Sequence, residues 1–182
     1  MLKNYFKWSL ICLLVCTTLQ AFSQKKDNYT FFKLYVSNEK GEILMVKWKG
    51  TWEVPGERYN DSLSIVHFLD KMATDCGIKV HPKQLSGLFT QYFQGRSNPT
   101  IFHWYSVKYI SGTLKIPEDC EEIKWFSLGE AIRTTPYPVA KLIMKKIRAN
   151  PGKVYGGAYQ VNYNENPPAG TYKILEDFYL LN

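Results

Sequence analysis

The sequence has no apolar run long enough to cross a membrane, although a short apolar stretch stands near its N-terminus. That stretch, residues 10–15, falls well below the roughly 20 residues that a spanning helix needs. Two lysines precede it, and the small residues Ala21 and Ser23 follow it at the positions expected before a cleavage site. The pattern predicts a secretory signal peptide over residues 1–23, and hence a secreted or periplasmic protein without a stable membrane span. An uncleaved anchor is the alternative, which the short apolar stretch disfavours.

Cysteine is scarce as well, with four residues in the chain, two of which leave with the predicted signal peptide. Cys76 and Cys120 remain, so the mature chain can form at most one disulfide in an oxidising compartment. Because Cys76 falls on the apolar side of a predicted helix, a buried thiol that acts as a small hydrophobe is the commoner explanation. The sequence leaves the pairing of these two cysteines open.

Acidic residues are fewer than basic ones, 16 against 23, which gives a formal net charge of +7. Removal of the signal peptide takes away two lysines and no acid, so the charge falls to +5 (7 − 2). The basic residues are scattered and form no block, unlike the concentrated basic patches of nucleic-acid-binding proteins. We therefore expect no binding of a nucleic acid duplex, whereas a small phosphorylated or nucleotide-like ligand is compatible with this charge.

Internal repeats and low-complexity segments are also missing, and the 159 residues that follow the signal peptide (182 − 23) have the length of one domain. Pro151 and Gly152 mark a change in the chain. We expect a principal unit over residues 24–150 and a C-terminal strand-pair extension over residues 151–182 that packs on the same domain.

Alternating apolar residues and turn signals predict the order of the elements. The expected strands are 29–36 and 43–48 as a hairpin, 85–94 and 101–110 as a long pair, 123–126, and finally 153–163 and 171–180. A small helix is expected to begin after Ser127, and a longer one with a basic outer face over residues 138–149.

The remaining predicted helix, residues 62–76, is amphipathic. Asp61 or Ser62 can cap its first amides, and Gly77 suits the left-handed residue that ends many helices. Its apolar side carries Leu63, Ile65, Val66, Phe68, Leu69, Met72, Ala73 and Cys76. Its polar side carries His67, Asp70, Lys71, Thr74 and Asp75.

A five-residue segment, Trp52-Glu53-Val54-Pro55-Gly56, precedes this helix, and together they resemble the Nudix hydrolase superfamily. The family's box is G-x5-E-x7-R-E-U-x-E-E-x-G-U, with U a bulky aliphatic residue. Gly56 and Gly77 take its glycine positions, and Met72 and Ile78 take aliphatic ones. The resemblance covers about residues 31–147. It implies an α/β fold, an α/β/α sandwich with a mixed sheet, and magnesium-dependent hydrolysis of nucleoside diphosphates linked to another moiety.

The chain departs from the box at the residues that carry the chemistry. Ser62 stands in place of the first glutamate and Asp70 in place of the arginine, while Lys71, Thr74 and Asp75 replace the three glutamates that converge on magnesium in the family. Asp75 is the surviving carboxylate, and we take Asp75 and Gly56 as candidate metal-binding positions. The cofactor is magnesium by resemblance, or none.

Other residues near the box are candidates for catalysis or binding. Asp70 can orient and charge His67 as a general base, although an exposed histidine is the commoner case. For the substrate we take Glu53 and Gly56, together with Trp104 and Tyr105, whose rings can stack on a base. Because neighbouring strand residues face opposite sides, only one of those two rings can line a given pocket. Glu57, Asp61, Glu118, Glu121 and Glu122 are further acids that could rebuild a metal site.

Two functions therefore stand as predictions. The first is a Nudix-superfamily protein with weak or lost magnesium-dependent hydrolysis, in which Asp75, Asp70 and His67 are the candidate catalytic residues. The second is an exported, non-catalytic module that binds a ligand in the old pocket or a protein through its C-terminal strands. The aromatic residues of those strands are Tyr155, Tyr159, Tyr163, Tyr172, Phe178 and Tyr179. Convergence of acids near Asp75 would favour the first function, and a Lys71–Asp75 ion pair the second.

Overall fold

The structure is a computed structural model that describes residues 30–59, 62–95, 98–162 and 171–182. The predicted signal peptide, Asp61 and Tyr163 lie outside these ranges. Among the described residues, no helix combines the length and the apolar character that crossing a bilayer requires.

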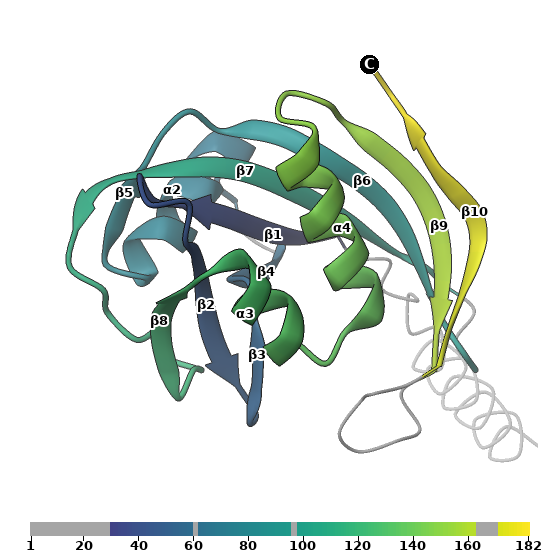
Figure 1. Ribbon diagram of the computed structural model, residues 1–182, viewed down its shortest axis with the longest axis horizontal. Coiled ribbons are helices and arrows are strands. Elements are labelled where there is room, and N and C mark those ends of the chain that lie inside the picture. Colours follow the sequence, from purple (N-terminus) through teal and green to yellow (C-terminus); the bar gives the residue numbers. More distant parts are fainter. Residues whose placement is uncertain (1–29, 60–61, 96–97, 163–170) are drawn as a thin grey trace, which may run out of the picture.

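The predicted elements appear in the predicted order along the chain (Figure 1), and three short strands, Thr51–Glu53, Gly56–Tyr59 and Ile78–Val80, were not predicted. The strands are β1 (Thr30–Ser37), β2 (Ile43–Trp48), β3 (Thr51–Glu53), β4 (Gly56–Tyr59), β5 (Ile78–Val80), β6 (Gln84–Phe93), β7 (Thr100–Gly112), β8 (Glu122–Phe126), β9 (Tyr155–Val161) and β10 (Tyr172–Leu180). The helices are α2 (Ile65–Asp75), α3 (Leu128–Thr134) and α4 (Pro138–Ala149).

The strands form one mixed sheet in the order β10-β9-β6-β7-β1-β2-β3, with β4 paired to β1, β5 to β7 and β8 to β2. β1 runs parallel to β7, and β6 runs parallel to β9. The other pairs are antiparallel. The predicted α/β class with a mixed sheet is confirmed, and the two C-terminal strands pair within the same sheet.

Helices cover the two faces of the sheet, so two separate apolar clusters form (Figure 1). α2 buries Phe68, Leu69 and Met72 against Phe32 and Leu34 of β1. Successive residues of a strand point to opposite faces of the sheet, so the remaining side chains of β1 and its neighbours point to the other face, where α3 and α4 cover them. That second cluster includes Tyr35, Met45, Trp104, Ala131, Ile143 and Tyr159.

The predicted hairpin of β1 and β2 exists only at its turn. Ser37 and Ile43 are the residues that pair across the two strands, and Gly41 takes the positive φ of +75° that the turn requires. Beyond the turn, β1 pairs with β7 and β4, whereas β2 pairs with β8 and β3. The two strands therefore pair with different neighbours over most of their length. The prediction that they form a hairpin along their whole length was wrong.

Helix α2 begins later than predicted, at Ile65, with Ser64 as its first flanking residue. Ser64 has an extended backbone and makes no side-chain capping bond, so the predicted cap at Ser62 was wrong, whereas Asp61 lies outside the described residues. Leu63 reaches the core from the segment before the helix, which leaves Ile65 and Val66 on the outer side at 42% and 54% exposure. At the other end, Gly77 has φ +76° as predicted.

Candidate functional site

A groove of about 640 Å³ lies between the end of α2, the strand β4 and the segment 115–120. Gly56, Glu57, Lys71 and Asp75 line it, so the box does bring its two ends to one place. Glu118 and Asp119 contribute further acids from the later segment. The groove is therefore the part of the molecule where the fold would hold a metal ion.

Lys71 occupies the centre of the charged groups in this groove. Its Nζ lies 3.0 Å from Oε1 and 3.2 Å from Oε2 of Glu57, and 3.0 Å from Oδ2 of Asp75. Partial burial by itself would lower the pKa of Lys71, but hydrogen bonds to Asp75 and Glu57 outweigh it and raise the pKa above its ordinary value. The lysine is thus a fixed cation between two carboxylates at neutral pH.

The donor set around Lys71 does not fit magnesium. Magnesium takes oxygen ligands in near-octahedral geometry. The carboxylates of Glu57 and Asp75, which lie on either side of Lys71, already accept hydrogen bonds from its ammonium group. Two unit charges 4 Å apart repel by about 4 kcal/mol at an effective dielectric of 20, and a dication doubles this. Among the described residues, no group of three or more histidine, cysteine or acidic side chains is placed to hold a metal ion.

A second lysine, Lys33, lies beside the groove and is almost fully buried. It forms an ion pair with Glu53, and its Nζ lies 5.2 Å from the ring centre of Phe31. A Cβ atom built on Gly56 would stand 2.6 Å from this Nζ, so the box glycine makes room for the lysine. Lys33 was not predicted as a site residue, although a lysine within the apolar strand 30–37 is a signal that could have pointed to it.

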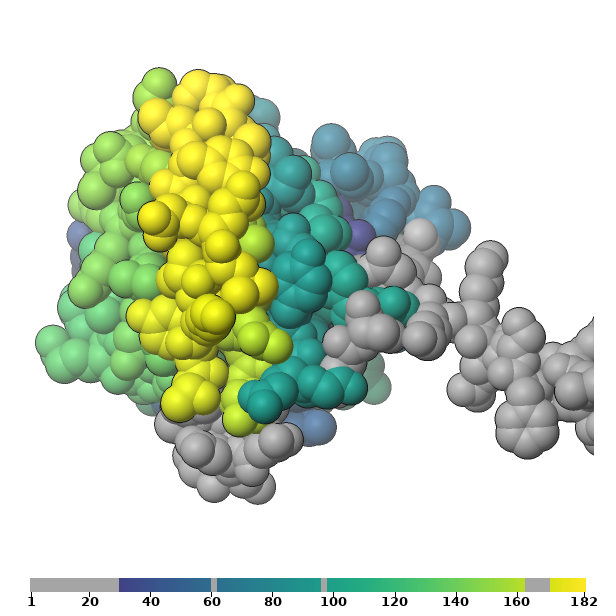
Figure 2. All heavy atoms as spheres, turned by 90° about the vertical axis from the view of Figure 1, so that its right-hand side faces the viewer, coloured from purple at the N-terminus to yellow at the C-terminus, as the bar shows by residue number. Residues whose placement is uncertain are grey.

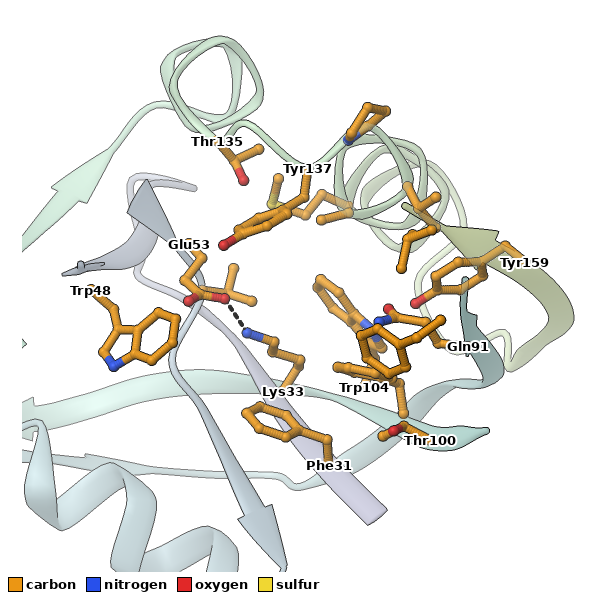
Figure 3. A pocket seen from close by; sticks show the side chains of 18 of the residues that line it. Phe31, Lys33, Trp48, Glu53, Gln91, Thr100, Trp104, Thr135, Tyr137 and Tyr159 are labelled. Atoms are coloured by element: carbon orange, nitrogen blue, oxygen red, sulfur yellow. Dashed lines mark hydrogen bonds and ion pairs between the residues drawn. The ribbon is translucent and has the colours of Figure 1, made fainter. Parts of the chain in front are cut away.

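A cavity of about 450 Å³ adjoins the groove and shares Phe31, Trp48 and Glu53 with it. It lies between the sheet and α4, and its walls are mostly aromatic and aliphatic (Figure 3). Trp104 lines it from β7, as proposed for substrate binding. Tyr105 lines neither the cavity nor the groove, because the next residue of a strand faces the other side. Its ring stacks instead on Phe32, with centroids 5.8 Å apart.

The two residues proposed for general base catalysis lie outside both spaces. His67 is exposed, and its Nδ1 lies 3.2 Å from Oγ of Ser64. Asp70 forms an ion pair of 2.7 Å with Lys83. Each of them therefore has a local partner on the surface, and the predicted contact between Asp70 and His67 is not among the observed ones.

The other acids named from the sequence are divided between the groove and the surface. Glu57 and Glu118 line the groove. Glu121 accepts a hydrogen bond of 2.8 Å from the amide of Gly50, and Glu122 one of 2.9 Å from Lys47. The acids after Asp119 thus hold the strand β2 and its turn, and they do not converge on Asp75.

Cys76 and Cys120 also line the groove, and both are free thiols. Burial raises the pKa of Cys76 to about 12, which keeps this thiol neutral.

The C-terminal aromatic residues serve mainly the core. Tyr155 and Tyr159 are buried, and the ring of Phe178 lies 4.8 Å from that of Phe89. Tyr172 and Tyr179 are exposed on β10, which runs in yellow along the side of the molecule in Figure 2. The strand carries two bulges, and its exposed acids and lysine are typical of an edge that resists pairing with another chain.

No family model matches the chain, and no curated protein does either. Solved structures do match. A mutator MutT protein from Bacillus halodurans has a TM-score of 0.61 at 15% identity, covering 81% of this chain and 97% of its own. A Nudix hydrolase from Nitrosomonas europaea has a TM-score of 0.63 at 11% identity, covering 75% and 81%. A MutT protein from Methanosarcina mazei has a TM-score of 0.57 at 20% identity, covering 71% and 99%.

These identities establish the fold and nothing finer. The chain has the Nudix fold, and the resemblance drawn from the box spacing is confirmed at that level.

Proposed function

We propose that this chain is a small-ligand-binding protein on the Nudix fold, without magnesium-dependent pyrophosphohydrolase activity. The observation that carries the proposal is the position of Lys71 between Glu57 and Asp75, each within 3.0 Å. The hydrolytic chemistry of the family requires carboxylates that gather a dication there, and the dication both activates water and neutralises the diphosphate. An ammonium group cannot activate water in this way, and the charge of Lys71 is already balanced by Glu57 and Asp75.

The cavity next to the groove supports the binding part of the proposal. Pockets that hold small molecules commonly measure about 300–1,000 Å³ and are lined by apolar and aromatic side chains with a few polar groups. This cavity has about 450 Å³ and fits that description.

The experiment uses the chain from residue 24 onward. Magnesium titrated to millimolar concentration should give no saturable heat in calorimetry, and ADP-ribose offered with magnesium should not be hydrolysed. The proposal fails if magnesium binds with micromolar affinity, if that binding is lost in Asp75→Ala, and if hydrolysis follows the same loss.

Export stays part of the proposal, since the N-terminal pattern predicts it. Mass spectrometry of the protein from its own cells should find a mature chain that begins at Gln24. A protein partner at the C-terminal strands stays a prediction as well.

A further inference from the structure

The net positive charge of the chain is concentrated in one segment. Residues 131–162 contain six lysines and arginines and no acidic residue. The whole chain has a formal net charge of +7, so its other 150 residues (182 − 32) contribute only +1 (7 − 6). The six cations are spread along the sequence, but four of them lie on α4, and a fifth, Lys153, follows that helix.

The cations at the end of α4 are not paired with acids. Lysines in other parts of the fold form ion pairs with neighbouring carboxylates. Among the residues that the structure describes, no acid lies within ion-pair distance of Lys145, Arg148 or Lys153. Glu42 belongs to the turn beside Arg148, but its carboxylate accepts a hydrogen bond of 2.7 Å from Asn38. The positive charge of these side chains therefore faces solvent without a bound counter-charge.

The helical repeat explains why they lie on one surface. Val139, Ile143, Met144 and Ile147 are the buried residues of α4, and they fix the side of the helix that faces the sheet. Lys145 and Arg148 are three residues apart on the opposite side, and both are exposed. Lys153 is exposed as well.

Two exposed leucines border these cations. Leu142, one helical turn before Lys145, is 37% exposed, and Leu180, at the end of β10, is 53% exposed. The amide of Leu181 donates a hydrogen bond of 2.8 Å to the carbonyl of Val154, so the end of β10 lies against the segment that follows α4. Figure 1 shows both ends toward the top of the molecule. We call Leu142, Lys145, Arg148, Lys153 and Leu180 the basic face.

An anionic phospholipid bilayer has partners for both kinds of side chain on this face. Its negative head groups attract the cations, with a gain of about fivefold in binding for each. Its acyl boundary removes exposed leucines from water. An acidic polypeptide or a nucleic acid has charges for the cations but no continuous apolar layer for the leucines.

We propose that the basic face docks the protein onto an anionic phospholipid bilayer, as a peripheral contact and without a helix that crosses it. The inference is independent of the proposed function, because no residue of the basic face lines the groove or the cavity.

The first experiment sediments the chain from residue 24 with lipid vesicles. Vesicles of equal parts of phosphatidylglycerol and phosphatidylcholine should bind it, and vesicles of phosphatidylcholine alone should not. Salt should weaken the binding, because the Debye length falls from about 10 Å at 0.1 M to about 3 Å at 1 M. Equal binding to the two kinds of vesicle overturns the proposal, and so does the absence of binding to both.

The second experiment removes two cations, in the double variant Lys145→Gln with Arg148→Gln. Binding to the mixed vesicles should weaken about 25-fold, from about fivefold for each charge. Both side chains are exposed, so the melting temperature should change little. The matched control is Lys49→Gln with Lys79→Gln, which removes the same charge from exposed lysines in the β2–β3 turn and on β5. A control that binds as weakly as the test variant overturns the placement of the contact on α4.

The third experiment separates a bilayer from a soluble polyanion. Leu142→Gln with Leu180→Gln should weaken binding to the mixed vesicles by roughly tenfold or more, since the exposed parts of the two side chains together approach one whole leucine. Any binding of poly-glutamate, which has no apolar layer, should be unchanged in this variant. If the leucine variant binds the mixed vesicles as tightly as the wild type, or if the wild type binds poly-glutamate and not the vesicles, the bilayer is refuted in favour of an acidic polypeptide.

Discussion

At the scale of single residues, Lys71 changes the chemistry of the groove more than any loss of a carboxylate elsewhere in the box. Glu57, which lies outside the family's metal-binding turn in sequence, contacts the lysine and forms part of the same cluster as Asp75. Thr74 instead points away, and its hydroxyl bonds to the carbonyl of Asp70. Position 71 is therefore the first one to change in a test of metal binding.

Lys71→Glu should create magnesium binding, because it places a third carboxylate between Glu57 and Asp75. Without metal this variant should be less stable than the wild type, since three acids would then repel one another. Magnesium at 100 times its dissociation constant should restore about 2.7 kcal/mol, seen as a rise in melting temperature. Lys71→Gln is the control, which removes the cation without adding a ligand and should not respond to magnesium. An unresponsive Lys71→Glu would mean that these three positions do not converge as the structure has them.

The pH dependence of stability should also report the ion pairs of Lys71. Its pKa is raised in the folded state by hydrogen bonds that outweigh burial, so the stabilisation is complete below the unfolded pKa of about 10.4 and is lost as pH rises through the folded value. Burial raises the pKa of Tyr35 to about 12, so the contribution of this tyrosine to the stability of the protein is lost in the same pH range. Both the wild type and Lys71→Gln contain Tyr35, so its contribution cancels in the difference between their free energies of unfolding in urea. It should be constant from pH 7 to 9 and shrink above pH 10.5; a difference that grows there would contradict the assignment.

At the scale of elements, the end of α2 depends on a glycine. Gly77 has φ +76°, and a Cβ built there would stand 2.1 Å from the carbonyl oxygen of Thr113. Gly77→Ala should therefore cost at least about 1–2 kcal/mol in urea unfolding, the penalty of the left-handed conformation alone. Gly129→Ala is the control, because this glycine sits inside α3 with open space around it, its nearest neighbour being an arginine nitrogen at 3.5 Å. That change should be neutral or stabilising by up to about 1 kcal/mol. Equal effects would refute the close contact at Gly77.

Elements whose signals are local could be predicted well from the sequence. The helix at Pro138–Ala149 was predicted with its bounds, since a proline at its first position and an apolar repeat both lie within the segment. Ser127 and Glu130 form the reciprocal capping box that their spacing suggests. The start of α2 was predicted three residues too early. Leu63 fits the helical spacing of apolar residues, but it reaches the core from the extended segment before the helix.

At the scale of the whole molecule, the sheet order and the cavity could not be predicted. The parallel pairing of β1 with β7 joins residues about 70 positions apart, as Thr30 with Ile101, and no local pattern encodes such a partner. The cavity depends on the same pairing, since Phe31 and Trp104 come to line one space only after β1 and β7 pair. The groove was easier, because the box spacing fixes both of its ends on consecutive elements.

The position of the C-terminal strands in the sheet bears on whether residues 151–182 can be removed without unfolding the rest. β9 inserts between β6 and β10, and its Tyr155 and Tyr159 are buried in the cluster beneath α4. A chain that ends at residue 150 should therefore lose cooperative unfolding, since it exposes the edge of β6 and leaves Phe89 without the rings of Tyr159 and Phe178. Circular dichroism during thermal unfolding measures this.

A milder truncation separates the contribution of β10 from that of β9. Removal of residues 171–182 keeps both tyrosines of β9 but takes away Phe178, whose ring packs over Gly157 and against Phe89. Loss of a fully buried phenylalanine side chain costs about 3–5 kcal/mol, and Phe178 is partly buried, so this chain should lose less than that and still unfold cooperatively, at a lower urea concentration. It should also self-associate, because β9 then becomes an edge without the bulges and charges of β10. If the chain ending at residue 150 unfolds as cooperatively as the full protein, residues 151–182 are an appendage and the core ends before them.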